Sequence, residues 1–392
     1  MQVVQLCLRF HPAPGGVETH VLELSKRLLA RGHQVRVLTS DLLTETPRKK
    51  LPKDRMHEMV AGGIEVERFR SISLPGVMHY TMFPSIADRL KDVEADVFHA
   101  HSYGYYHVNA AVKVRKERDV PLVLTTHFHP VSSITEGKGR KVLRKVYDER
   151  MGKKGLRACD SIICVSKAEA EELGALDVDA EKVHVIPNGV DMARFDTMPS
   201  PDLFRERSGI DAPFIMFAGR LAPNKRLDVL VDAMAHVVES ESKVHLVIIG
   251  GDGGAMKETR ARIKKLGLDN RVHVLGHMDD DEMFRSAYAA SEMLALSSDF
   301  EAFGIVLAEA MAAGKPCVST RVGGTTDVVE DGRTGLLVPP GDAKGMAKAL
   351  LELLEDPERR KRMGEAGRER VRAKFTWDIV AEQVELVYKS II

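Results

Sequence analysis

Short apolar runs alternate with amphipathic helical patterns along the whole chain, and this alternation constrains the fold more than any other feature. One helical pattern is Glu18–Ala30, where apolar residues recur every three or four positions. The runs that predict strands are Val3–Leu8, Gln34–Thr39, Val97–Ala100, Leu122–Thr126, Ser161–Val165, Val183–Ile186, Phe214–Ala218, His245–Ile249, Val272–Leu275, Met293–Leu296, Pro316–Ser319 and Gly335–Val338. Because repeated strand–helix–strand units form parallel sheets covered by helices, the sequence predicts an α/β fold.

The pattern breaks once, in the proline-containing polar segment PSPDLFRERSGIDAP. We therefore predict a linker at 196–212 between two Rossmann-like doubly wound domains, residues 1–195 and 213–375. The last amphipathic pattern, Trp377–Ile391, predicts a C-terminal helix within 376–392. Ligands bind at the carboxyl ends of strands in such sheets, so we expect the two domains to face each other across a cleft that holds the active site.

Composition excludes several classes of protein. The 57 basic and 57 acidic residues give a net charge of zero, which argues against a general nucleic-acid binder. The four cysteines form no C-x-x-C pair, as expected of a reduced intracellular protein. The N-terminal sequence lacks the features of a signal peptide, and no stretch of 18 apolar residues occurs. We expect a cytoplasmic protein.

The stretch from Ser298 to Glu309 follows a predicted strand and opens a helix. Gly304 allows a ligand close to the backbone, and the free N–H groups at Ile305 and Val306 would bind an anion. Glu309 lies among apolar residues, where a carboxylate needs partners such as two sugar hydroxyls. Glu301 sits at the strand end, where it can face the cleft. The alternative is a capped helix with a solvated Glu309.

Two further loops follow strands in the second half. Arg220 and Lys225 follow the strand Phe214–Ala218, and both side chains suit phosphate oxygens, although they could be plain surface cations. The glycine-rich turn around Gly251 fails the G-x-G-x-x-G test, because its last position is Met256. That turn indicates either close approach to a ligand or a tight strand–helix connection, and it disfavours an NAD enzyme.

Glycines and histidines mark the strand ends of the first half. Gly15 and Gly16 open the first helix and leave room for a substrate, unless they form a plain loop. Histidines end two neighbouring predicted strands: His99 and His101 on one, His127 and His129 on the next. Four histidines could bind a metal ion, but no carboxylate or cysteine accompanies them at fixed spacing. Hydrogen bonding to a polyhydroxylated ligand fits better, and histidines with purely structural bonds are the remaining alternative.

Taken in order, these motifs resemble family 4 of the glycosyltransferases, the retaining enzymes of the GT-B fold. The resemblance covers nearly the whole chain, and it implies that the helix within 376–392 packs back on the N-terminal domain. It is strongest from Ser298 to Pro339, where Glu301 and Glu309 have the family's Glu-x7-Glu spacing and are followed by Gly323-Gly324. It implies transfer of a sugar from a nucleotide-diphosphate donor such as a UDP- or GDP-sugar, with retention of configuration and without a metal or other cofactor.

The resemblance also implies roles for individual residues. His101, Glu301, Arg220 and Lys225 would be catalytic, and His127 and His129 would lie on the acceptor side. The donor contacts implied are Gly15, Gly16, Arg220, Lys225, Gly251, Met278, Glu301, Phe303, Gly304, Ile305, Val306 and Glu309. Arg226 and Asp327 depart from the family pattern, which commonly has Gly and Glu there. The alternatives are a nucleotide-sugar epimerase or hydrolase of the same fold and an inactive carbohydrate-binding protein.

A basic segment, 137–157, is the last sequence feature that bears on function. It carries nine basic and two acidic residues, and Leu143, Val146, Tyr147 and Met151 recur at helical spacing. Such a helix can bind an anionic lipid surface, which predicts peripheral contact with the cytoplasmic face of a membrane and a lipid-linked acceptor. In the alternative, the apolar stripe packs on its own domain and the charges are simply solvated.

Overall fold

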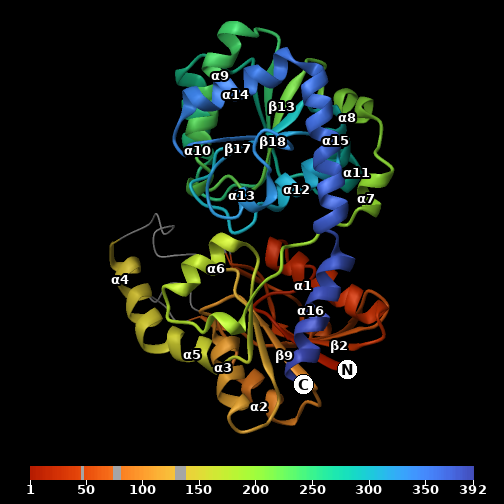
Figure 1. The fold of residues 1–392 in the computed structure, drawn as a ribbon, viewed down its shortest axis with the longest axis vertical. Coiled ribbons are helices and arrows are strands. Elements are labelled where there is room, and N and C mark those ends of the chain that lie inside the picture. Colours follow the sequence, from red (N-terminus) through yellow and green to blue (C-terminus); the bar gives the residue numbers. More distant parts are fainter. Residues whose placement is uncertain (46–47, 74–80, 129–137) are drawn as a thin grey trace. The chain divides into compact units, whose positions relative to one another are not determined.

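A computed structural model describes residues 1–45, 48–73, 81–128 and 138–392. The chain forms two compact units of mixed α/β structure (Figure 1). Unit 1 comprises Met1–Gly189 and Trp377–Ile392, and unit 2 comprises Val190–Thr376. Each unit is built on a sheet of mostly parallel strands, which confirms the prediction of two Rossmann-like doubly wound domains.

The sheet of unit 1 has eight strands in the order β12-β11-β10-β9-β1-β2-β6-β5. Neighbouring strands are parallel except β5, which pairs antiparallel with β6. The strands are β1 Gln2–Leu6, β2 Gln34–Ser40, β5 His57–Val60, β6 Ile64–Phe69, β9 Val97–His101, β10 Leu122–Thr125, β11 Ser161–Cys164 and β12 Val183–Val185. Two small antiparallel pairs flank it: β3 Leu42–Glu45 with β4 Arg48–Lys50, and β7 Ile72–Ser73 with β8 Thr81–Met82.

Alternating side chains of these strands feed two hydrophobic cores, one on each face of the sheet. Val3 and Val35 belong to the core beneath helices α1 and α16, whereas Val4 and Leu38 belong to the core beneath α2 and α3. The helices of unit 1 are α1 Gly16–Ala30, α2 Ser85–Asp92, α3 Tyr106–Arg115, α4 Lys138–Tyr147, α5 Lys153–Ala158, α6 Lys167–Gly174 and α16 Trp377–Ile391.

The C-terminal helix α16 belongs to unit 1 rather than to the unit that precedes it in sequence. It packs against α1, and Val380, Val384 and Tyr388 are buried in the core beneath both helices. A Cβ atom on Gly189 would lie 2.4 Å from the Trp377 ring, so the absence of a side chain allows this close packing.

The sheet of unit 2 has six parallel strands in the order β15-β14-β13-β16-β17-β18. They are β13 Phe214–Ala218, β14 His245–Ile249, β15 Val272–Gly276, β16 Met293–Leu296, β17 Cys317–Thr320 and β18 Gly335–Val338. Helices α9, α10 and α14 cover one face, and α8, α11 and α15 cover the other (Figure 1). The helices are α7 Ala193–Asp196, α8 Pro201–Ser208, α9 Leu227–Ser240, α10 Met256–Lys265, α11 Asp281–Ala290, α12 Ile305–Ala312, α13 Thr325–Val328, α14 Ala343–Glu355 and α15 Pro357–Lys374.

The segment 196–212, predicted to be a linker, contains helix α8 and is part of unit 2. Ser200 caps this helix through its side chain, and proline is at its first position, where it is well tolerated. Phe204 is fully buried and contacts Phe214, while its backbone N–H donates to Ser286 on α11. One of the prolines that suggested a linker, Pro201, therefore starts a packed helix, and the boundary between the units lies at Gly189.

None of the helices formed by the described residues is both long enough and apolar enough to span a lipid bilayer.

Candidate active site

In unit 2, the loops that follow β13 and β14 are joined backbone to backbone. A Cβ atom on Gly250 would lie only 1.8 Å from the carbonyl oxygen of Gly219, so this position requires glycine. The Leu221 N–H donates to the Gly251 carbonyl at 2.8 Å. Arg220 extends from this joined loop and is exposed, and its guanidinium makes no hydrogen bond or ion pair with any described residue. The prediction that Arg220 is available to a ligand is therefore consistent with its position.

Lys225 and Glu301, which are 76 residues apart, meet at the carboxyl ends of β13 and β16. The Lys225 ammonium donates to Glu301 Oε1 at 2.5 Å, and the Ser298 hydroxyl donates to the same oxygen at 2.6 Å. The side chain of Glu301 is 10% exposed and that of Lys225 is 20% exposed. Oε1 accepts both of these hydrogen bonds, so Oε2 remains available to a ligand. The result is a nearly buried ion pair at the carboxyl edge of the sheet.

Helix α12 begins directly after this pair. Gly304 precedes it with a φ of +89°, a left-handed conformation that glycine adopts without strain. The Gly323-Gly324 turn packs against the preceding loop, since a Cβ on Gly323 would lie 2.2 Å from the Glu301 carbonyl oxygen. The half-buried Ile305 and Val306 therefore present their N–H groups from a rigid helix start. The ring of Phe303, by contrast, is buried against Phe375, so only its backbone could meet a donor.

Glu309 has protein partners that the sequence did not indicate. The Tyr288 hydroxyl donates to Glu309 Oε2 at 3.2 Å, and the Arg194 guanidinium lies 3.9 Å from Oε1. Burial raises the pKa of Glu309, and Arg194 opposes this rise. Its side chain remains 18% exposed, so the carboxylate can still meet a ligand. The Glu309 carboxylate is therefore not fully solvated, as one hypothesis from the sequence had it, and it does not depend on a ligand for all of its partners.

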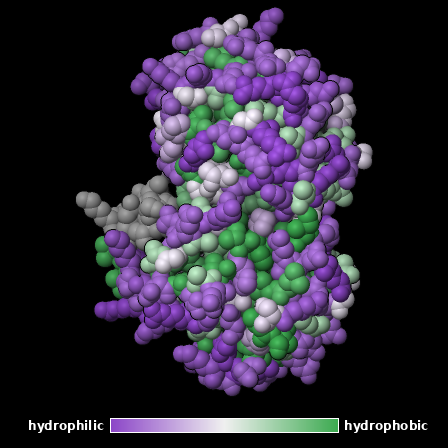
Figure 2. Space-filling model, in the orientation of Figure 1, coloured by the Kyte–Doolittle hydropathy of each residue, from purple (hydrophilic) through white to green (hydrophobic). Residues whose placement is uncertain are grey.

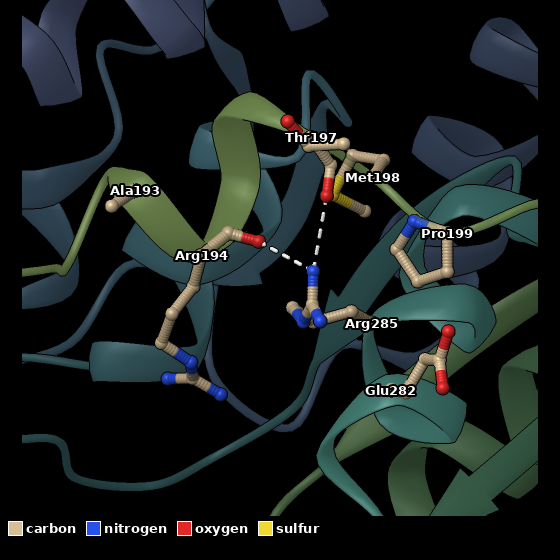
Figure 3. Close-up of a pocket in the computed structure, with 7 residues that line it drawn as sticks. All are labelled: Ala193, Arg194, Thr197, Met198, Pro199, Glu282 and Arg285. Atoms are coloured by element: carbon tan, nitrogen blue, oxygen red, sulfur yellow. Dashed lines mark hydrogen bonds between the residues drawn. The ribbon is translucent and has the colours of Figure 1, made fainter.

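Arg194 also borders a pocket of unit 2, drawn in Figure 3. The pocket lies between the turn that follows α7 and helix α11. The Arg285 guanidinium holds that turn, donating to the carbonyl oxygens of Arg194 and Thr197 at 2.8 and 3.1 Å. The remaining lining residues are Ala193, Met198, Pro199 and Glu282. Of the residues predicted for the site, none lines this pocket.

The two departures from the family pattern have visible structural settings. Arg226, where the family commonly has Gly, has a φ of +47°, a left-handed value that disfavours side chains. Its guanidinium pairs with Asp228 at 2.9 Å and with Asp299 at 3.1 Å. Asp327 lies in the short helix α13 that follows the Gly323-Gly324 turn. Met278 is half-buried after β15, beyond Gly276, whose φ is +79°.

In unit 1, Gly15 and Gly16 lie at the exposed start of α1. Gly15 has a φ of +153°, and a Cβ there would lie 2.1 Å from Glu18 Oε2. The Glu18 carboxylate is buried and pairs with Arg9 at 2.7 Å. The start of α1 is therefore open to a ligand, with an ion pair directly behind it.

The four predicted histidines of unit 1 do not form one group. Both ring nitrogens of His99 are engaged, Nδ1 with the Tyr388 hydroxyl at 2.6 Å and Nε2 with Thr125 Oγ1 at 2.7 Å, so His99 is structural. His101 is fully buried at the end of β9, and the half-buried His127 follows β10. His129 lies outside the described residues. Instead, His20 on α1 lies beside His101 and His127, and no motif in the sequence indicated it.

Comparison with known proteins agrees with this architecture. The family model described as "Glycosyltransferase Family 4" matches residues 14–194, and the model described as "Glycosyl transferases group 1" matches residues 202–370. A phosphatidyl-myo-inositol mannosyltransferase of Mycobacterium leprae is 32% identical over 405 residues, covering 100% of this chain and 97% of the relative. A D-inositol 3-phosphate glycosyltransferase of Xylanimonas cellulosilytica is 33% identical, covering 95% of this chain and 91% of the relative.

Solved structures share the fold. The sucrose-phosphate synthase of Thermosynechococcus elongatus superposes with a TM-score of 0.77 at 24% identity, covering 100% of this chain and 99% of that one. The Anabaena protein HepE, solved in complex with UDP, gives the same TM-score of 0.77 at 22% identity and covers both chains completely.

Two Rossmann-like units with these strand-end motifs define a GT-B glycosyltransferase. The chain belongs to the family 4 glycosyltransferases, and its second half matches the model for glycosyl transferases group 1. It is therefore an enzyme that transfers sugars.

Proposed function

We propose that the protein transfers a sugar from a nucleotide-diphosphate sugar, UDP- or GDP-linked, to an acceptor, with retention of configuration and without a metal ion. The observation that carries this proposal is the Lys225–Glu301 pair at the start of α12. A cation, an exposed guanidinium at Arg220 and a helix N-terminus gather at one edge of the sheet of unit 2. Such groups stabilise the charge that develops on a diphosphate leaving group.

The roles of the other residues follow the same logic. Arg220, Lys225 and the N–H groups of Gly304, Ile305 and Val306 would bind the diphosphate. Glu309, held by Tyr288 and Arg194, would accept hydrogen bonds from the ribose hydroxyls. Glu301 would contact the donor sugar through its free oxygen, and a donor-sugar contact by His101 is part of the proposal. The nucleotide base of the donor would lie near Met278, and the backbone of Gly251 would lie close to the donor.

For the acceptor, we propose an inositol ring that carries a phosphate, either free or in a lipid. Two relatives of at least 32% identity are named for phosphatidyl-myo-inositol and for D-inositol 3-phosphate. The acceptor-side residue His127 is half-buried and can bond hydroxyls. Arg48, Lys49 and Lys50, which form the exposed strand β4, supply positive charge in the same unit.

The experiment incubates the chain with UDP- and GDP-sugars and with each inositol acceptor. Mass spectrometry identifies the product, and proton NMR reads the anomeric configuration. A glycosylated inositol with the donor's configuration supports the proposal. Free sugar alone would indicate a hydrolase, and a changed sugar on the nucleotide would indicate an epimerase. Activity should persist in EDTA, because Lys225 and Arg220 supply the charge that a metal would otherwise supply. Loss in EDTA and rescue by Mg²⁺ or Mn²⁺ would contradict metal independence.

The segment from α4 to α5 supports a second element of the proposal, peripheral contact with an anionic membrane. Leu143, Val146 and Met151, three of the four residues of the predicted apolar stripe, are 45%, 45% and 51% exposed. Tyr147 alone turns inward, against the ring of Tyr103. Figure 2 shows hydrophobic side chains at the edge of the molecule where Figure 1 places α4. An exposed apolar stripe among basic residues is the pattern of a helix that lies in a lipid interface.

Co-sedimentation with phosphatidylserine-containing vesicles tests this contact. Lys145 is the better residue to reverse, because Arg144 pairs with Asp148 at 2.8 Å and lies over the Tyr103 ring, so its loss would also disturb the fold. A Leu143→Ser, Lys145→Glu, Val146→Ser variant should no longer pellet at low salt. Leu386→Ser, which changes another exposed apolar residue of unit 1, is the control. Unchanged pelleting of the triple variant would contradict membrane contact through α4.

A further inference from the structure

Three histidines of unit 1 form a cluster that the proposed transfer reaction leaves partly unexplained. One ring nitrogen from each of His20, His101 and His127 lies within 4.8 Å of the other two. The three residues come from separate elements, α1, the end of β9 and the loop after β10. His20 is 2% exposed and His101 is fully buried, whereas His127 is half-buried and links the cluster to the surface.

Two of the rings, His20 and His101, each form a hydrogen bond with an amide group outside the cluster, and these outer hydrogen bonds fix the positions of the ring protons. The His20 Nδ1 lies 2.7 Å from Asn188 Oδ1, and the His101 Nε2 lies 2.6 Å from Gln5 Oε1. An amide oxygen only accepts, so the proton of each neutral ring is on the nitrogen that faces the amide. Gln5 is itself oriented by Tyr388, toward which its amide nitrogen donates at 3.4 Å.

The opposite nitrogens, His20 Nε2 and His101 Nδ1, therefore carry lone pairs. Neither has a hydrogen-bond partner among the residues that the structure describes, although both are buried. Burial also keeps water from supplying a hydrogen bond to either nitrogen. Buried acceptors without donors are costly, and a ligand that accepts lone pairs would remove this cost.

We propose that His20, His101 and His127 form a binding site for a zinc-like divalent metal ion. Three imidazoles with a fourth position left for water or a ligand are an established zinc arrangement, and metal-binding histidines typically donate their other N–H to an oxygen, as His20 and His101 do here. A hard ion such as Mg²⁺ would instead require oxygen ligands. Nitrogens around Zn²⁺ lie about 3.4 Å apart, given Zn–N bonds of about 2.0–2.1 Å. The three nitrogens lie within 4.8 Å of one another, so the rings would have to move closer by up to about 1.4 Å when the ion binds.

This site is separate from the leaving-group chemistry of unit 2, for which the proposed function requires no metal ion. Its expected effect is inhibition, because a metal held by His101 would block the contact with the donor sugar that is proposed for this residue. That consequence rests on the proposed function, whereas the binding itself does not.

The test titrates the full chain, stripped of metal by a chelator, with Zn²⁺ in a calorimeter and with Co²⁺ by visible absorption. We expect one ion per chain. The four cysteines are all buried and will not compete. His20→Gln should weaken binding by at least about tenfold, and Asn188→Ala, which removes only the outer hydrogen bond, by about 10–100-fold. His184→Gln, which changes a histidine of β12 outside the cluster, is the control and should bind as the parent chain does.

Circular dichroism of each metal-free variant checks the fold. If His20→Gln does not fold, Asn188→Ala and His127→Gln carry the test. Absence of stoichiometric binding, or equal affinity in all variants, would overturn the proposal. Stabilisation by myo-inositol that depends on His20, without zinc binding, would also overturn it and assign the cluster to a polyol. Zinc binding that leaves transfer unaffected would support the site and contradict the role proposed for His101.

Discussion

The candidate functional groups of the two units differ in charge. In unit 2, Lys225 and Glu301 form a nearly buried ion pair beside the cation Arg220, and Glu309 is held by Arg194. In unit 1, His20, His101 and His127 form a cluster that carries no carboxylate, and the two most buried rings are neutral near pH 7. Charged groups suit a donor that loses a diphosphate, whereas neutral lone pairs suit hydroxyls or a metal ion. The four predictions below test this difference, beginning with the largest expected effect.

Lys225→Ala should lower kcat by about 10²–10³-fold and change KM less, because the charge on the leaving group grows in the transition state. The substitution also leaves the nearly buried Glu301 with the Ser298 hydroxyl as its one remaining side-chain partner among the described residues. Steady-state kinetics with the identified donor measures the effect, and Lys257→Ala on α10 is the control. An increase in KM with unchanged kcat would show that Lys225 binds donor and transition state equally.

Acidification should destabilise unit 1 more than unit 2. Burial lowers the pKa of His20 and of His107 from 6.5 to about 4. As the pH falls below 6.5 the unfolded chain takes up these protons first, so the stability present above pH 6.5 is lost toward pH 4. Each of these two histidines lowers the free energy of unfolding by up to roughly 3 kcal/mol over this pH range. The four histidines of unit 2, His236, His245, His273 and His277, are all at least partly exposed.

Hydrogen exchange followed by mass spectrometry, converted to opening free energies at pH 7 and pH 4.5, can resolve the two units. We expect the larger loss in unit 1, and His107→Gln should reduce it by up to roughly 3 kcal/mol, the share of that one histidine. His236→Gln serves as the control in unit 2. Equal losses in both units would contradict the assignment of acid sensitivity to the buried histidines.

Glu309→Ala should weaken nucleotide-sugar binding by roughly 1–3 kcal/mol, the value of hydrogen bonds to a charged acceptor. Glu309→Gln should lose less, because its amide oxygen can still accept from Tyr288. Isothermal calorimetry provides the affinities, with Glu258→Ala on α10 as the control. Unchanged donor affinity in Glu309→Ala would remove this carboxylate from the proposed site.

Arg226→Gly should have the smallest effect, a change of less than about 1 kcal/mol in the unfolding free energy. Glycine would relieve the left-handed backbone at φ +47°, but the ion pairs with Asp228 and Asp299 would be lost. Thermal unfolding measures the difference. A loss of several kcal/mol would mean that these ion pairs stabilise the loop far more than exposed pairs usually do.

The donor side of the proposed site could be predicted because its residues lie in short windows at strand ends. Glu301, Gly304 and Glu309 fall within nine residues of sequence, and the carboxyl ends of parallel strands meet at one edge of a sheet. In the sheet order, β13 and β16 are neighbours, so the Lys225 ammonium reaches the Glu301 carboxylate. Local pattern and general topology were sufficient here.

The linker failed as a prediction for a physical reason. Proline is common in linkers, but it is equally common at the first turn of a helix, where its missing N–H has no partner to lose. Composition alone cannot distinguish the two settings. The burial of Phe204 against Phe214 decided for the helix.

The sequence by itself determined the two Rossmann-like domains, the strand-end motifs and the membership of the family, because apolar periodicity and short motifs are local properties. Only the tertiary structure decided which histidines meet and which amide groups hold them. His20 and its partner Asn188 are 168 residues apart, and His101 and its partner Gln5 are 96 residues apart. It also decided that Arg194 and Tyr288 hold Glu309. Contacts of this kind depend on how helices pack on the sheet, and the spacing of residues along the chain does not record that packing.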